Sequence, residues 1–186
     1  MPRPFTRAYL VAAGAILLTV SLAGTGSDDQ PAPHVRGATL DTALLLDELI
    51  ARSPTARDLV ERLNQSDLLL YIEYRRFSSE TLRGRIGLLS STVTRRVFAI
   101  EIDPRHTMTD RLVALGHELW HAVEIADAAS VRDPQSLAAF YAAIGVLTGD
   151  AGGLATYETS AAIDAARLVR SELAAGAAAA HAADRN

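Results

Sequence analysis

Residues 107–127 constrain the fold more than any other segment of this chain. Their apolar side chains recur at the three- and four-residue spacing of an amphipathic helix. At about 100° per residue, six of them gather on one side as a core-facing stripe: Leu112, Leu115, Leu119, Ala122, Val123 and Ala126. His117, His121 and Glu124 lie within about 60° of one another on the opposite side. The pattern predicts a long helix that buries one face and carries polar side chains on the other.

The polar side of this helix contains an HExxH motif, formed by His117, Glu118 and His121. Histidines four residues apart lie on the same helical face, the arrangement with which a helix binds zinc. The chain has no cysteine, so thiol nucleophiles, disulfides and cysteine zinc sites are excluded, and any metal must be bound by His, Asp or Glu. With zinc bound, Glu118 could accept a proton from activated water without itself binding the ion. The competing interpretation is a pair of exposed helix histidines with no metal.

The stretch from Gly116 to Val123, GHELWHAV, resembles the active-site helix of the zincin metallopeptidases. Its flanking residues are uncharged, as in that family's extended motif, and a strand precedes the helix in the same order. The resemblance covers about residues 97–166. It implies a small α+β zincin-like domain, with a short, mostly antiparallel sheet packed on the HExxH helix and further helices after it. It also implies a bound Zn²⁺ and an extended peptide or protein substrate that pairs with a sheet edge beside the cleft.

Catalytic zinc usually has three protein ligands, so a third ligand is expected downstream of the two histidines. Glu158, in the sequence ETSA, resembles the ExxA signature of the gluzincin branch, whose third ligand is a glutamate on a later helix. Asp127 gives a metzincin-like spacing, but Glu124 occupies the position where that branch has a glycine turn. Glu124 itself is about 10.5 Å along the helix axis from His117, which favours a role in orienting a ligand. Glu158 is the favoured ligand, with Asp127 and Glu124 as alternatives.

Hydrolysis through zinc also needs a donor that stabilises the developing oxyanion. The available side chains are those of His106, Tyr141 and Tyr157, and the sequence does not choose between them. Gluzincins similar to thermolysin carry an aspartate four residues after the glutamate ligand. This chain has Asp164 six residues after Glu158, which departs from that pattern.

The remaining pattern predicts alternating helical and extended segments. Helices are expected over 39–51, from Pro54 after the cap Ser53, from a cap at Thr107 or Thr109 to Asp127, over 134–147 and over 154–175. The sequences LLLYIEY, RIGLLSS and RRVFAIEID are expected to form strands.

The N-terminal residues have the composition of an export signal. Two arginines precede an apolar run that ends in small residues at Ala23, which predicts a signal peptide over 1–23 or, if it is not cleaved, a membrane anchor. We expect a flexible linker over 24–37, the metallopeptidase domain over 38–175 and a low-complexity tail over 176–186, either a fraying helix or disordered.

The formal net charge of -4 gives no electrostatic reason to expect nucleic acid or an anionic membrane as a partner. The sequence therefore predicts an exported zinc-dependent peptidase that acts on peptides or proteins. Two alternatives stay open. One is an inactive zinc-binding or interaction domain on the same scaffold, and the other is a membrane-anchored envelope protein in which the motif is a coincidence.

Overall fold

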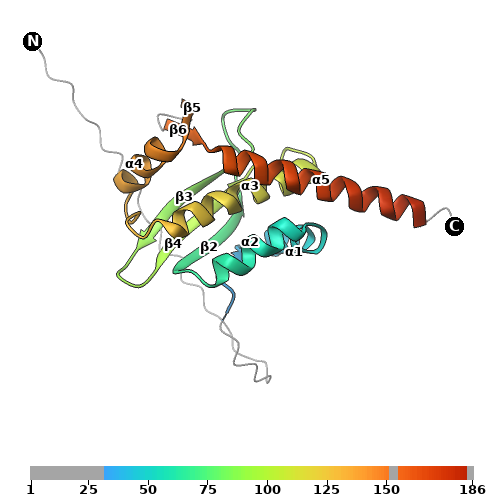
Figure 1. The fold of residues 1–186 in the computed structure, drawn as a ribbon, viewed down its shortest axis with the longest axis horizontal. Helices are drawn as coiled ribbons and strands as arrows, with labels where there is room; N and C mark the ends of the chain where they lie inside the picture. The colour runs from blue at the N-terminus through green and yellow to red at the C-terminus, as the bar shows by residue number, and fades with distance from the viewer. Residues whose placement is uncertain (1–31, 151–154, 184–186) are drawn as a thin grey trace, which may run out of the picture. The chain divides into compact units, whose positions relative to one another are not determined.

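The computed structural model describes residues 32–150 and 155–183, which form an α+β fold (Figure 1). In chain order the elements are β1 (Val35–Gly37), α1 (Leu40–Arg52), α2 (Pro54–Asn64), β2 (Leu68–Tyr74), β3 (Gly84–Ser91), β4 (Arg96–Ile102), α3 (Met108–Asp127), α4 (Pro134–Ile144), β5 (Val146–Asp150), β6 (Ala155–Glu158) and α5 (Ser160–Ala183). The predicted signal peptide and the first part of the predicted linker lie outside the described residues. Within the described ranges, no helix combines the length and apolar character needed to cross a bilayer.

The main sheet has four strands in the order β1-β2-β4-β3. β1 is parallel to β2 and β2 is parallel to β4, whereas β3 is an edge strand antiparallel to β4. The prediction of a mostly antiparallel sheet is therefore wrong. Two parallel pairings cause the difference. β4 pairs with β2 rather than only with the preceding β3, and β1, a three-residue strand inside the predicted linker, is connected by α1 and α2 to a parallel β2.

The core lies between one face of the sheet and α3. Alternate residues of β2 and β4 point to this face and are fully buried, among them Leu70, Ile72, Phe98 and Ile100. α5, α2 and α1 pack against the other sides of α3, so the helix is buried well beyond its apolar stripe. At Gly116 a Cβ atom would lie 2.8 Å from a methyl carbon of Val169, so the glycine allows α5 to approach α3 closely.

Helix starts follow the predicted caps. Ser53 accepts a hydrogen bond from Ala56 N at the start of α2, and Pro54 occupies the first turn. Of the two threonines proposed for α3, Thr107 is the N-cap and accepts from Asp110 N.

The segment between α4 and α5 differs from the prediction. α4 ends at Ile144 rather than at residue 147, and residues 155–158 form β6 rather than the first turn of a helix from 154. β5 and β6 pair as an antiparallel hairpin. Each strand is too short for a period to be recognised, and the pairing partner that stabilises it is non-local. α5 then continues to Ala183, so the described part of the predicted tail is helical.

Candidate metal centre

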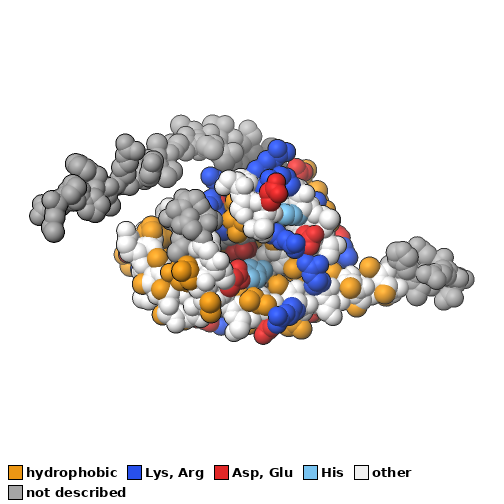
Figure 2. Space-filling model, turned by 90° about the horizontal axis from the view of Figure 1, so that it is seen from above, with side chains coloured by type: hydrophobic (Ala, Val, Ile, Leu, Met, Phe, Trp, Pro, Cys, Tyr) orange, Lys and Arg blue, Asp and Glu red, His pale blue; other side chains and the backbone are white. Residues whose placement is uncertain are grey.

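The central turns of α3 hold the two histidines of the motif against each other. Their Nε2 atoms are 3.1 Å apart and their rings meet edge to face. The His121 side chain is almost fully buried, and that of His117 is 16% exposed. Figure 2 shows histidine and acidic side chains side by side in a hollow near the centre of the view.

Glu158 reaches this pair from β6. Its Oε2 atom lies 3.0 Å from His117 Nε2, and one ligand atom from each of His117, His121 and Glu158 lies within 4.8 Å of the others. These three residues form a candidate metal-binding triad. Glu158 occupies the last position of a strand, directly before α5, whereas the resemblance implied a helical position. Its pairing with Val146 across the hairpin fixes the backbone of this residue.

The two alternative third ligands lie away from the triad. Asp127 is exposed and forms an ion pair with Arg62, 2.6 Å from Oδ2 to Nη2. Glu124 contacts the opposite side of His121, with its Oε2 atom 2.8 Å from His121 Nδ1. The position of Glu124 agrees with the expectation that it orients a ligand.

Glu124 is held by two further donors. Thr159 Oγ1 donates to it at 2.6 Å and Trp120 Nε1 at 3.1 Å. Burial alone would raise the pKa of Glu124, but the hydrogen bonds from His121, Thr159 and Trp120 outweigh it and hold the pKa below its ordinary value. An ionised Glu124 can only accept, so Nδ1 of His121 carries the hydrogen and Nε2 presents a lone pair to the triad.

The triad contains more acceptors than hydrogens. His117 Nε2 has at most one hydrogen, yet it faces both the lone pair of His121 Nε2 and a carboxylate oxygen of Glu158. A cation would satisfy all three atoms together. Tetrahedral zinc with bonds of about 2.0–2.2 Å places its ligand atoms about 3.3–3.6 Å apart. His117 Nε2 lies slightly closer than this to the other two ligand atoms, at 3.0 and 3.1 Å, and all three ligand atoms lie within 4.8 Å of one another. The donor set fits zinc.

The pKa directions agree with a site that favours positive charge. For Glu158, burial alone would raise the pKa, but the hydrogen bond from His117 and the electrostatic influence of the two imidazoles lower it overall. For His117, burial alone would lower the pKa, but the carboxylates of Glu158 and Glu118 raise it overall. Both shifts follow from the mutual attraction of the Glu158 carboxylate and the His117 imidazole.

Glu118 lies beside the triad and lines a cavity of about 390 Å³. The residue is buried, and burial raises the pKa of its carboxyl group. Among the described residues, burial and nearby charges shift this pKa, and no hydrogen bond to the carboxylate contributes to the shift. Gly84 of β3 leaves the space that the carboxylate occupies, since a Cβ there would lie 3.0 Å from Glu118 Oε1. Glu118 thus places a carboxylate on the lining of this cavity.

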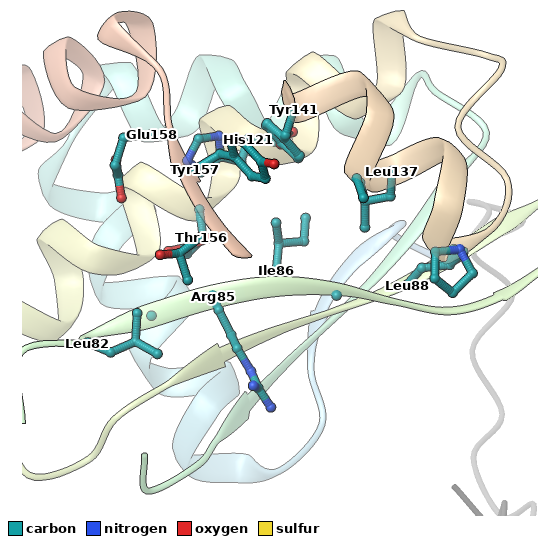
Figure 3. A pocket seen from close by; sticks show the side chains of 15 residues that line it. Leu82, Arg85, Ile86, Leu88, His121, Leu137, Tyr141, Thr156, Tyr157 and Glu158 are labelled. Atoms are coloured by element: carbon teal, nitrogen blue, oxygen red, sulfur yellow. The ribbon is translucent and has the colours of Figure 1, made fainter. Parts of the chain in front are cut away.

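The structure separates the residues considered as oxyanion donors. Tyr157 and Tyr141 line the cavity, and Figure 3 shows both beside His121. The Tyr141 hydroxyl donates to the backbone carbonyl of His121 at 3.1 Å, so it is engaged in holding α4 to α3. His106 is not among the cavity residues, and Asp164 is exposed and paired with Arg167.

The sequence analysis did not identify two residues of the site, Thr159 and Gly84. Thr159 caps α5 through Ala162 N and also donates to Glu124, so it connects the start of α5 to α3. A threonine before a helix is a recognisable cap, but the helix was predicted to begin at 154 and the signal was hidden. Gly84 carries no local sequence signal, because its importance comes from Glu118, which lies on another element.

Comparison with protein-family models, curated proteins and solved structures finds no significant match to this chain. The conclusion that these observations carry is a candidate His117–His121–Glu158 metal site in an α+β fold.

Proposed function

We propose that this protein is an exported zinc-dependent metallopeptidase. One observation carries the proposal: His117, His121 and Glu158 bring their ligand atoms together, and two of them, His121 and Glu158, line a cavity that is also lined by Glu118. The resemblance of GHELWHAV to the zincin active-site helix supports the choice of zinc and of peptide hydrolysis. The apolar N-terminal run with its small residues at 21–23 supports export.

When bound, zinc would supply Lewis acidity, which polarises the substrate carbonyl and makes water more acidic. His117, His121 and Glu158 would hold the ion, and Glu124 would fix the His121 ring in the tautomer that binds it. Glu118 would accept a proton from the attacking water and return it to the departing amine. Its buried position favours this exchange, because a raised pKa brings the carboxylate closer to the range in which it can both take and give a proton.

Strand β3 would position the substrate. It is an edge strand of the main sheet and lines the cavity, so an extended peptide could pair with its outer backbone groups. Tyr157 is the best-placed donor for the oxyanion, since the Tyr141 hydroxyl already donates to a backbone carbonyl.

The variant Glu118→Gln tests the proposal. We expect the purified protein to cleave members of a mixed synthetic peptide library, detected by mass spectrometry, and to lose this activity when zinc is chelated. Glu118→Gln should retain one zinc per chain and lose at least about 10²-fold in rate, the lower end for a general base. Zinc binding without any hydrolysis by the unmodified protein would instead support the inactive zinc-binding scaffold. Unchanged hydrolysis by Glu118→Gln would contradict the assigned mechanism.

A further inference from the structure

The cavity beside the candidate triad is lined mostly by apolar side chains. β3 contributes Ile86 and Leu88 to one wall, and α4 contributes Leu137 and Ala138 to the other. In Figure 3 Leu137 points from α4 towards β3, and Tyr157 lies at the end near His121. The volume of about 390 Å³ falls in the range of pockets that enclose most of a small ligand. The cavity can therefore accept a large side chain together with part of its backbone.

The cavity has no cationic side chain aimed into it from the described residues that line it. Arg85 contributes to the lining, but its guanidinium turns away from the cavity, as Figure 3 shows. It forms an ion pair with Glu101 and stacks over the ring of Phe77 on the other face of β3. The charged groups that remain are Glu118 and Glu158, which belong to the site described above. An acidic substrate side chain would therefore meet only negative charge, and a basic one would lose water without gaining a partner in the apolar part.

We propose that this site acts on peptides with a bulky, uncharged apolar residue, of the leucine or phenylalanine class, next to the reacting carbonyl. The side chain of that residue enters the cavity between β3 and α4. The inference rests on the proposed zinc peptidase function and names its substrate class. Burial of the side chain supplies the binding energy, since removal of apolar surface from water is favourable in proportion to its area.

Ala138 is a lining position at which a larger side chain would reduce the volume of this cavity. It lies on an exposed part of α4 and still contributes to the lining, whereas its neighbour Ala139 is equally exposed and is not among the cavity residues. A large side chain at position 138 would occupy the space that we assign to the substrate. The same side chain at position 139 would point elsewhere, which makes the two substitutions a matched pair on one helix.

The test uses two zinc-binding probes that differ only in their side chain. N-acetyl-leucine hydroxamate and N-acetyl-glycine hydroxamate are titrated by calorimetry into the zinc-loaded protein, Ala138→Trp and Ala139→Trp. We expect the unmodified protein and Ala139→Trp to bind the leucine probe at least about 10-fold more tightly than the glycine probe. Ala138→Trp should bind the glycine probe normally and lose most of this preference.

Equal affinity of the two probes for the zinc-loaded protein would overturn the inference and leave the zinc peptidase proposal standing. A preference that survives in Ala138→Trp would also overturn it, because the leucine side chain would then bind elsewhere. Failure of the protein to load zinc would overturn the proposed function and this inference with it.

Discussion

Two polar clusters contact helix α3, and they differ in whether the protein supplies a hydrogen-bond partner for each of their polar atoms. At its C-terminal end the guanidinium of Arg96, fully buried, meets the carboxylate of Asp67 at 2.6 and 2.8 Å and donates to the backbone carbonyls that end the helix. At its centre, His117, His121 and Glu158 turn acceptor atoms towards one another. The protein satisfies the first cluster by itself, whereas the second is a candidate site for a cation.

This difference distinguishes two kinds of buried polar cluster beside one helix. A buried charge whose partners are all supplied by the protein stabilises the fold, as Arg96 does by capping α3. A cluster with fewer hydrogens than acceptors has a composition that favours a ligand. A cluster with too few hydrogens for its acceptors is therefore a candidate binding site.

The largest expected effect comes from breaking the first cluster, formed by Arg96 and Asp67. Arg96→Met would leave Asp67 and the helix-ending carbonyls without their donor, and we expect it to lower the free energy of unfolding by about 3–5 kcal/mol. Urea unfolding of the purified protein measures this loss. Arg62→Met is the matched control: it removes an exposed ion pair with Asp127 and should cost at most about 1 kcal/mol. Similar losses in the two variants would break the comparison.

Zinc bound at the second cluster, formed by His117, His121 and Glu158, should stabilise the folded protein by a similar amount. A ligand that binds only the folded state adds about 4.1 kcal/mol to the free energy of unfolding at 1,000 times its dissociation constant. We therefore expect zinc to raise the urea midpoint of the metal-free protein and to have no such effect on His121→Ala. Stabilisation of His121→Ala by zinc to the same extent would place the metal outside the triad.

Glu124 should have an intermediate effect through His121. Glu124→Gln removes the charge that holds the His121 ring, and we expect zinc affinity to fall by about 10-fold, the lower end for a residue that supports a metal ligand. Competition with a zinc-binding dye measures the change. Asp127→Asn, one turn further along α3 and away from the triad, should leave the affinity unchanged. Equal losses in both variants would show that charge alone, rather than the contact with His121, sets the affinity.

Substitutions at Gly84 and Gly87 test the role of Glu118, which lies beside the second cluster. A Cβ at Gly84 would press on the Glu118 carboxylate, whereas a Cβ at Gly87 meets no atom within 4 Å. We expect Gly84→Ala to lower kcat by about 10-fold with zinc content unchanged, since a displaced general base loses catalytic efficiency. Gly87→Ala should behave like the unmodified protein in the same peptide assay. A normal kcat in Gly84→Ala would mean that Glu118 tolerates displacement.

The HExxH helix could be predicted because its information is local. The spacing of Leu112, Leu115 and Leu119 fixes the helix and its buried face, and the spacing of His117 and His121 brings the two imidazoles together. Even the supporting position of Glu124 follows from helical geometry. The structure adds the second contact surface, made by α5, which no periodicity within α3 could reveal.

The features that the sequence did not predict correctly depend on pairing between segments that are distant in the chain. β1 has three residues and exists because it pairs with β2, so its sequence alone looks like a linker. Glu158 was found as a ligand candidate from its sequence context, but its strand depends on the pairing with β5. Arg96 could not be recognised as the cap of α3, because Asp67 and the carbonyl of Ile125 are each 29 residues away in the chain.

Metal content of the purified protein tests the central claim most directly. Elemental mass spectrometry is applied to the unmodified protein, His121→Ala, Glu158→Ala and, as a control, Asp127→Ala. We predict one zinc per chain in the unmodified protein and in Asp127→Ala, and its loss in His121→Ala and Glu158→Ala. No zinc in the unmodified protein after supplementation, or zinc that survives Glu158→Ala, would contradict the assignment of the triad.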